Sequence, residues 1–379
     1  MGIDFLHLLS GGHAAQGHDG PHAAHRKKEY VFDNGTLGAG GYSKVVKAKW
    51  KARSSMIVAV KVVRKEAVKD RAGYLRVIDV GFPRINQHPN ICAGLDWFET
   101  PTKFYVTFPI LTGGELLERL NTRGRFTEDA TKKVVKTILE ILAFIHSHGI
   151  IHRDIKPDNF LYRTPKSEID DIVLIDFGIS KYPSVNSPSP VRLAPLYPPS
   201  ALRSCPRASR QSLQILDSQS DEDPKNQFEA GGTPGYAAPE VFCGTGYGKN
   251  SDLFGAGVIA YNLLSSWSPW ESHDTISLIQ ETAHSNINFP PGPFEGVSEE
   301  AKTFVRYLMQ PPLKRPSAKV ALKHKWIAGH VDSTDDSDHI LNRREADEST
   351  VEPIQPHPTV RPHHTLARQI TALSSINGH

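Results

Sequence analysis

Short runs of alternating hydrophobic and polar residues mark the first structured part of the chain. They occur at residues 31–37, 45–50, 57–64, 96–98 and 104–108. Alternation with a period of two is typical of β-strands that bury one face. The pattern from Tyr30 to about Ile110 therefore predicts an antiparallel β-sheet.

From Glu115 onward the hydrophobic residues recur with the period of an α-helix. The clearest example is the segment 127–147, whose apolar stripe contains Ala130, Val134, Val135, Ile138, Ile141, Leu142 and Ile145. Apolar residues at this spacing share one helix face and pack against a core. We expect a second, mainly helical lobe, and hence an α+β fold.

Three segments show neither pattern. Residues 1–29 are rich in Gly, Ala and His, residues 182–228 in Ser, Pro, Arg and Gln, and residues 329–379 in His, Pro, Asp and Thr. Segments of this composition have few residues that could form a core. We predict a disordered leader, a disordered insert and a disordered tail.

The composition excludes several classes of protein. Of the 379 residues 39% are hydrophobic, enough for a core in one large or two fused lobes. No apolar run reaches the roughly 18 residues that cross a bilayer and no signal-peptide pattern is present, so we expect a cytoplasmic location, with the nucleus as the alternative. A net charge of +3 is small against 44 basic and 41 acidic residues, which gives no case for nucleic acid or membrane as a partner.

A glycine-rich stretch lies between the first two expected strands. Its residues are Gly38, Ala39, Gly40, Gly41, Tyr42, Ser43, Lys44 and Val45. Backbone without Cβ atoms can approach phosphate oxygens and offer N–H groups to them, although a plain tight hairpin would explain the glycines equally well. Lys61 ends the apolar run Val58-Ala59-Val60 in the following strand, where it could supply a fixed cation for phosphates.

Two motifs in the second half carry the strongest signal. Residues 152–159 read His-Arg-Asp-Ile-Lys-Pro-Asp-Asn, and Asp176-Phe177-Gly178 begins seventeen residues after Asn159. These motifs resemble the catalytic loop and the metal-binding motif of the eukaryotic serine/threonine protein kinase family. The resemblance implies that Asp154 accepts the substrate hydroxyl proton, that Asn159 and Asp176 hold two Mg2+ ions, and that Lys156 steadies the moving phosphoryl group.

The resemblance extends over residues 30–328. Residues 232–240 are similar to a substrate-docking loop that ends in Ala-Pro-Glu, so Thr233 is expected beside Asp154 and Lys156, and Glu240 is expected to pair with Arg315. The family fold implies a small antiparallel N-lobe with one helix at residues 30–110 and a larger helical C-lobe at residues 111–328. The ATP-binding residues that it implies are Leu37, Gly38, Ala39, Gly40, Gly41, Tyr42, Ser43, Val45, Ala59, Lys61, Asp79, Phe108, Ile110, Leu111, Glu115 and Leu161.

Within the family the chain is most similar to the calcium/calmodulin-dependent group. The similarity rests on residues 111–117, on Ser43 in place of a third loop glycine, and on the segment 318–326. In that group the residue matching Glu115 contacts the ATP ribose or a substrate arginine. The alternative is that Glu115 is an exposed glutamate at the start of a helix, where the helix dipole favours a negative charge. Calmodulin is a partner of that group, but the acidic residues 329–350 offer no basic amphipathic helix to bind it.

The sequence also departs from the family pattern. Asp79, eighteen residues beyond Lys61, stands in place of the glutamate that pairs with this lysine in an active kinase, and Gly81-Phe82-Pro83 predicts a short or kinked helix there. Phe254 and Gly255 replace the usual Trp-Ser pair after Asp252. An active kinase that uses ATP on protein substrates is the main hypothesis, and a nucleotide-binding pseudokinase or scaffold is the alternative.

Overall fold

The computed structural model describes residues 26–39, 43–181, 232–242, 248–272, 274–284 and 287–329. The predictions of a disordered insert at 182–228 and of a disordered tail fall outside these residues, apart from Gly329 at the start of that tail, and so do most of the leader and Gly40, Gly41 and Tyr42 of the glycine-rich stretch. The last four residues of the expected leader, Arg26–Glu29, instead form a short 3-10 helix against the sheet.

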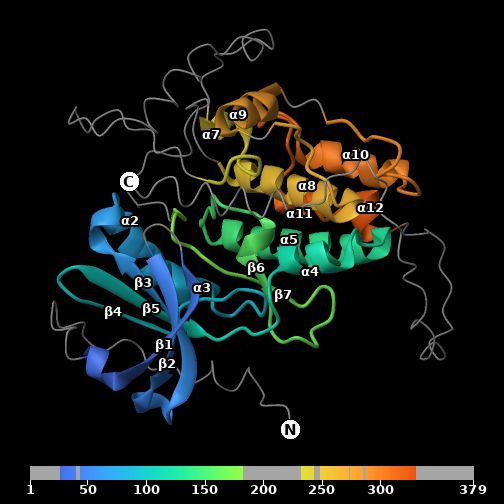
Figure 1. Ribbon diagram of the computed structural model, residues 1–379. Coiled ribbons are helices and arrows are strands. Elements are labelled where there is room, and N and C mark those ends of the chain that lie inside the picture. Colours follow the sequence, from blue (N-terminus) through green and yellow to red (C-terminus); the bar gives the residue numbers. More distant parts are fainter. Residues whose placement is uncertain are drawn as a thin grey trace, which may run out of the picture.

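The N-lobe contains a five-stranded antiparallel sheet, which lies at the lower left of Figure 1. Its spatial order is β1-β2-β3-β5-β4, and each neighbouring pair is antiparallel. The strands are β1 (Tyr30–Ala39), β2 (Ser43–Trp50), β3 (Met56–Arg64), β4 (Asp96–Glu99) and β5 (Lys103–Pro109). The five predicted strands are therefore confirmed. Buried and more exposed residues alternate along most of β2 and β3, as expected for strands with one buried face, whereas β1 is largely exposed and the centre of β5 is buried throughout.

An interrupted helix connects β3 to β4. It consists of α2 (Arg71–Arg76), a wide π turn (Val77–Gly81) and α3 (Phe82–Ile85). In the wide turn the Phe82 N–H donates to the Val77 carbonyl, five residues back. Pro83 has no N–H to give to the Asp79 carbonyl, so the regular hydrogen-bond ladder cannot pass through this point. The predicted kinked helix is confirmed.

The C-lobe is mainly helical and lies at the upper right of Figure 1. Its longest helix contains the predicted apolar stripe, and its first turn is capped by the Thr127 hydroxyl, which accepts from the Ala130 N–H at 3.2 Å. Its elements are α4 (Leu116–Arg123), α5 (Glu128–Ser147), β6 (Phe160–Tyr162), β7 (Ile172–Leu174), α7 (Pro239–Phe242), α8 (Lys249–Ser265), α9 (Thr275–His284), α10 (Glu299–Leu308), α11 (Ala318–Ala321) and α12 (Lys325–Ala328).

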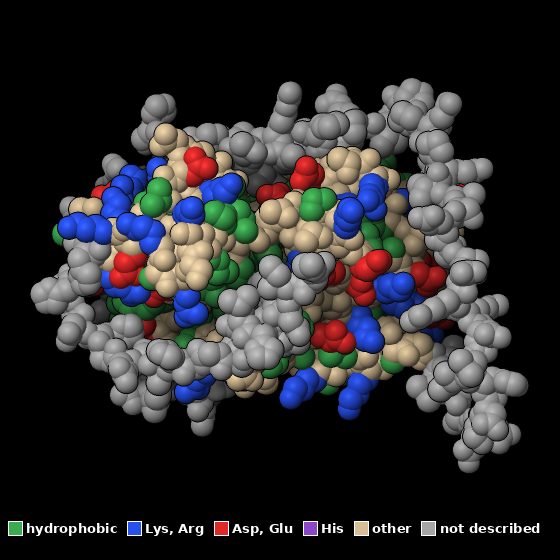
Figure 2. Space-filling view, turned by 90° about the horizontal axis from the view of Figure 1, so that it is seen from below, with side chains coloured by type: hydrophobic (Ala, Val, Ile, Leu, Met, Phe, Trp, Pro, Cys, Tyr) green, Lys and Arg blue, Asp and Glu red, His purple; other side chains and the backbone are tan. Residues whose placement is uncertain are grey.

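The α+β, two-lobed architecture predicted from the sequence is confirmed. One large core runs through the C-lobe and includes the interrupted helix of the N-lobe, and a second, aromatic cluster lies on the other face of the sheet. On the face shown in Figure 2, acidic and basic side chains are interspersed over both lobes. None of the helices in the described ranges is long and apolar enough to cross a bilayer.

Candidate active site

The loop between α5 and β6 carries the first motif and is fixed from below by Asp252 of α8. One carboxylate oxygen of Asp252 accepts from the His152 N–H at 2.9 Å and the other from the Arg153 N–H at 2.8 Å, while His146 lies 2.8 Å away. Burial alone would raise the pKa of Asp252, but these hydrogen bonds and the histidine hold it below its ordinary 3.8. A charged carboxylate therefore fixes the backbone of the loop.

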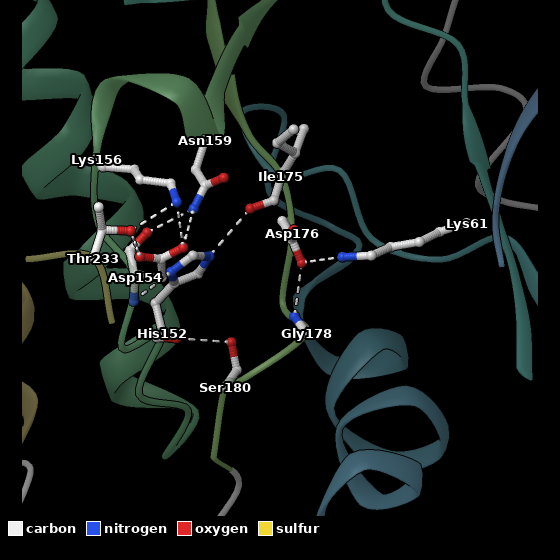
Figure 3. Close-up of polar contacts among 10 residues, drawn as sticks. All are labelled: Lys61, His152, Asp154, Lys156, Asn159, Ile175, Asp176, Gly178, Ser180 and Thr233. Atoms are coloured by element: carbon white, nitrogen blue, oxygen red, sulfur yellow. Dashed lines mark hydrogen bonds and ion pairs between the residues drawn. The ribbon is translucent and has the colours of Figure 1, made fainter. Parts of the chain in front are cut away.

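Four side chains converge above this loop (Figure 3). The Thr233 hydroxyl donates to one oxygen of Asp154 at 2.7 Å, and Lys156 donates to that hydroxyl at 2.8 Å and lies 3.0 Å from the other oxygen of Asp154. The Asn159 amide nitrogen donates to the Asp154 carbonyl at 2.7 Å and to its carboxylate at 3.0 Å. The structure thus brings together residues that stand 79 positions apart in the sequence.

Lys156 stays a cation in this cluster. Burial acts to lower its pKa, but the charge and hydrogen bond of Asp154, together with the charges of Asp158 and Asp176, raise it above 10.5. Asp154 consequently faces a fixed positive charge and a hydroxyl at the same time. This arrangement can hold a second hydroxyl, that of a substrate, within hydrogen-bond reach of a carboxylate base.

Asp176 follows β7 and pairs with Lys61, which extends from β3 across the gap between the lobes (Figure 3). Asp176 has a left-handed backbone, with φ at 59°, and its carboxylate accepts from the Gly178 N–H at 3.0 Å. Burial acts to raise the pKa of Asp176, but the Lys61 charge and these hydrogen bonds outweigh it and lower the pKa to about 2. The carboxylate is therefore ionised at every physiological pH.

Asp79 does not take the place expected for it. The structure pairs Lys61 with Asp176, while the Asp79 carboxylate accepts from the indole N–H of Trp97 on β4 at 2.7 Å. The prediction placed Asp79 by its distance in sequence from Lys61 and from residues 88–91. Such a count takes no account of the π turn, which changes the direction in which each residue within it points. Val77 and Ile78 consequently face inward and Asp79 lies exposed on the outer side.

The ring of Phe177 connects this helix with the catalytic loop. It meets the Phe82 ring edge-on, with 5.6 Å between centroids, and the His152 ring, with 4.9 Å between centroids. Phe82 in turn fills the space beside Gly94, where an added Cβ atom would lie 2.7 Å from the Phe82 ring. The sequence did not predict this contact, although the pair Gly81-Phe82 at the expected helix kink was an available signal.

Strand pairing aligns the expected nucleotide-binding residues along the sheet. Gly38 pairs with Val45, Val45 with Lys61, and Ala59 with Phe108. Leu161 on β6 forms a backbone bridge with Glu115, just beyond Ile110 and Leu111. Leu37, Ala39 and Ser43 lie at the ends of β1 and β2 that meet the glycine-rich stretch.

Glu115 precedes α4 and forms an acidic group with Glu118 and Asp158, of which the sequence predicted only Glu115 as a site residue. Its pKa is raised by burial and by the charges of Asp158 and Glu118, against a smaller opposite effect of Lys156. The pKa of Asp158 is also raised, first by burial. A cation that binds among such carboxylates stabilises their charged form. Asp158 lay within the recognised motif, and its acidic character was the available signal.

The oxygen atoms of Asn159 and Asp176 fit a magnesium site whose remaining ligands would come from the phosphates of a nucleotide. In the described part of the chain no group of three or more His, Cys, Asp or Glu residues could hold a metal ion by itself. Mg2+ does not need such a group, because one or two carboxylates and phosphate oxygens suffice. The Asn159 amide nitrogen is committed to Asp154, so its amide oxygen is the atom left for a cation (Figure 3).

Comparison with known proteins agrees with this geometry. The family model described as "Protein kinase domain" matches residues 32–202 and 214–327. The calcium/calmodulin-dependent protein kinase cmkA of Emericella nidulans is 34% identical over 83% of this chain and 66% of its own length, so the match spans just under two thirds of that relative. The calcium/calmodulin-dependent protein kinases type 1 of Macrobrachium nipponense and type 1B of Homo sapiens are 32% and 33% identical, over 79% and 77% of this chain and 75% and 74% of their own.

The predicted resemblance is thereby confirmed in fold, in motifs and in relatives. The matched residues include the loop around Asp154, the Asp176 motif and the docking loop at Thr233. The chain belongs to the protein kinase family, and the relatives that it resembles are named calcium/calmodulin-dependent protein kinases.

Proposed function

We propose that the protein transfers the γ-phosphate of Mg-ATP to serine and threonine hydroxyls of protein substrates. The observation that carries the proposal is the cluster in which the Thr233 hydroxyl lies 2.7 Å from Asp154 and 2.8 Å from Lys156. A carboxylate and an ammonium group that already share one hydroxyl are suited to orient another. Phosphoryl transfer asks for little beyond such positioning and charge neutralisation.

Each residue of the site then has a role. Asp154 accepts a hydrogen bond, and finally the proton, from the attacking hydroxyl, and Lys156 offsets the negative charge of the transferred group. Asn159 and Asp176 would hold the magnesium ions, which neutralise the phosphate charge when bound. Lys61 is within reach of both Asp176 and the nucleotide side of the sheet, so its cation would serve the α- and β-phosphates.

The adenine and ribose would lie between the lobes. The supporting residues are Leu37, Val45, Ala59 and Phe108 on the sheet, the segment Ile110–Leu111, and Leu161 below. Gly38, Ala39 and Ser43 lie at the ends of β1 and β2 that would approach the phosphates. Gly40, Gly41 and Tyr42 belong to the same proposed phosphate contact and lie outside the described residues.

We further propose a preference for a basic residue three positions before the target. Burial and the charges of Asp158 and Glu118 raise the pKa of Glu115, and burial raises that of Asp158. A guanidinium group placed among these carboxylates would offset their repulsion. The proposed kinase domain covers residues 30–328. Calmodulin is suggested only by the names of the relatives, and a cytoplasmic location stays a prediction.

The competing function is a nucleotide-binding scaffold with weak or no catalysis. The observation that favours it is the exposed Asp79, which leaves Lys61 without the helix partner of an active kinase. Against it stands the presence of all three residues: Asp154 and Asn159 are joined by a hydrogen bond, and Asp176 is held by Lys61 and the Gly178 N–H.

The test is transfer of labelled phosphate from Mg-ATP to an Arg-x-x-Ser peptide by the wild type and by Asp154→Asn. We expect transfer by the wild type and none by the variant, while both bind ATP with similar affinity. A peptide with Ala in place of the basic residue should be a poorer substrate. Equal background transfer by both proteins, with ATP still bound, would support the scaffold instead.

A further inference from the structure

The interrupted helix needs an anchor, because its position decides where Phe177 and Asp176 lie. Phe82 on this helix contacts Phe177 at 5.6 Å between ring centroids, and Phe177 directly follows Asp176. The Phe82 ring is confined on its other side by Gly94 and by Phe108, whose ring centroid is 6.0 Å away. A small shift of the helix would therefore move the carboxylate that is proposed to hold magnesium.

The usual anchor, an ion pair from the β3 lysine to the helix, is not the one that this structure uses. Lys61 pairs with Asp176, and Asp79 lies on the opposite, exposed side of the helix. There the Asp79 carboxylate accepts from the Trp97 indole N–H at 2.7 Å, well within hydrogen-bond distance. This bond joins the wide turn directly to the outermost strand of the sheet, β4.

Trp97 is itself fixed by its neighbours. Arg26 donates to the Trp97 carbonyl at 3.0 Å and to the Asp96 carboxylate at 2.7 Å. The Tyr30 hydroxyl donates to the same Asp96 oxygen at 2.9 Å and accepts from the Thr107 hydroxyl at 3.1 Å. The indole therefore projects from a strand that Arg26 and Tyr30 hold in place. Its hydrogen bond to Asp79 fixes the helix relative to that strand.

We propose that Asp79 is a positioning residue that acts through Trp97, and that this hydrogen bond replaces the lysine–glutamate pair as the anchor of the helix. The inference rests on the proposed function, since the helix matters through Phe82, Phe177 and Asp176. It differs from the expectation drawn from the sequence in one decisive respect. What Asp79 contributes is a hydrogen-bond acceptor for an indole, and the negative charge is not required.

The test compares Asp79→Ala, Asp79→Asn, Asp79→Glu, Trp97→Phe and the double variant Asp79→Ala/Trp97→Phe in the full chain. Loss of one such hydrogen bond should lower kcat about 3- to 10-fold in Asp79→Ala and in Trp97→Phe. The kcat of the double variant should be no lower than that of the less active single variant, because both changes remove the same hydrogen bond. Asp79→Asn should keep kcat within about 2-fold, because its amide oxygen still accepts from the indole.

The rival explanation, in which Asp79 acts by its charge on Lys61, gives the opposite pattern. Asp79→Asn would then lose as much as Asp79→Ala, and Asp79→Glu would exceed the wild type because its longer side chain reaches further toward Lys61. Either result, or an unchanged kcat in Trp97→Phe, overturns the proposal. Asp79 is exposed, so its variants should fold, and their melting temperatures will verify this.

Hydrogen exchange gives a readout that does not depend on catalysis. If the wild type transfers no phosphate, the proposed function fails, but the anchor can still be measured. The amides of residues 77–82, 84 and 85 should exchange faster in Asp79→Ala and Trp97→Phe than in the wild type, and stay protected in Asp79→Asn. Unchanged exchange in Asp79→Ala would contradict the proposal.

Discussion

The close approach of α8 to the catalytic loop at Gly255 gives a prediction that can be worked from the structure. A Cβ atom at this position would lie 2.5 Å from the Ile155 carbonyl oxygen and 3.0 Å from the Ile155 Cβ atom. Carbon and oxygen in ordinary contact stay about 3.3 Å apart, so the loop or the helix would have to move by roughly 0.8 Å. Ile155 directly follows Asp154, and that displacement would be felt at the proposed base.

Gly255→Ala should therefore affect both stability and activity. Overpacking of this kind costs about 1–3 kcal/mol, partly offset by the roughly 1 kcal/mol that alanine gains over glycine inside a helix. Misplacement of a catalytic group by about 1 Å can cost on the order of 100-fold in rate, so we expect kcat to fall about 10- to 100-fold. Peptide phosphorylation and a denaturant titration measure the two effects.

Gly257→Ala on the same helix is the matched control. Its Cβ atom would lie 2.6 Å from Met309 and 3.0 Å from Leu308, which crowds α10 and leaves the catalytic loop untouched. This variant should lose stability by a comparable amount and keep its kcat. If Gly255→Ala keeps the wild-type kcat, or if Gly257→Ala loses as much, the close approach to Ile155 does not position the loop and the reasoning is wrong.

Three further predictions concern charged groups. Glu240→Gln should cost about 3–5 kcal/mol in a denaturant titration, because it removes the partner of Arg315, which lies 2.6 Å away and is 1% exposed; a loss below about 1 kcal/mol would contradict this. Glu115→Gln should reduce the preference for an Arg-containing peptide over an Ala-containing one. In the wild type the same preference should weaken as the pH falls toward the raised pKa of Glu115, so a pH-independent ratio would argue against it. The pKa of Asp252 is lowered from 3.8, so its contribution to stability is present above about pH 4 and is lost as the pH falls further. The difference in the free energy of unfolding between the wild type and Asp252→Asn should therefore shrink below about pH 4 in urea titrations.

Local patterns predicted the strands and the long helix well, because the alternation in β2 and β3 and the apolar stripe of α5 follow directly from which side of each element is buried. The motif around Asp154 was recognisable because its eight consecutive residues resemble those of a known family, although its geometry also depends on the distant Asp252 and Thr233. The position of Asp79 was not predictable, because a count of residues back from 88–91 does not show which way each side chain points in the π turn that precedes Pro83. Its partner Trp97 lies on β4, and no spacing rule connects an aspartate in a helix with an indole on a strand eighteen residues away.

The contacts of Arg26 and Tyr30 also bear on where the folded unit begins. The family match starts at residue 32, yet the Tyr30 ring stacks on Trp50 and Phe98, with centroids 5.5 Å and 5.2 Å away. A recombinant protein trimmed to the family boundary would lose the centre of this aromatic cluster and both ties to Asp96. An expression boundary upstream of Arg26 retains them, which makes this short turn part of the catalytic domain in practice.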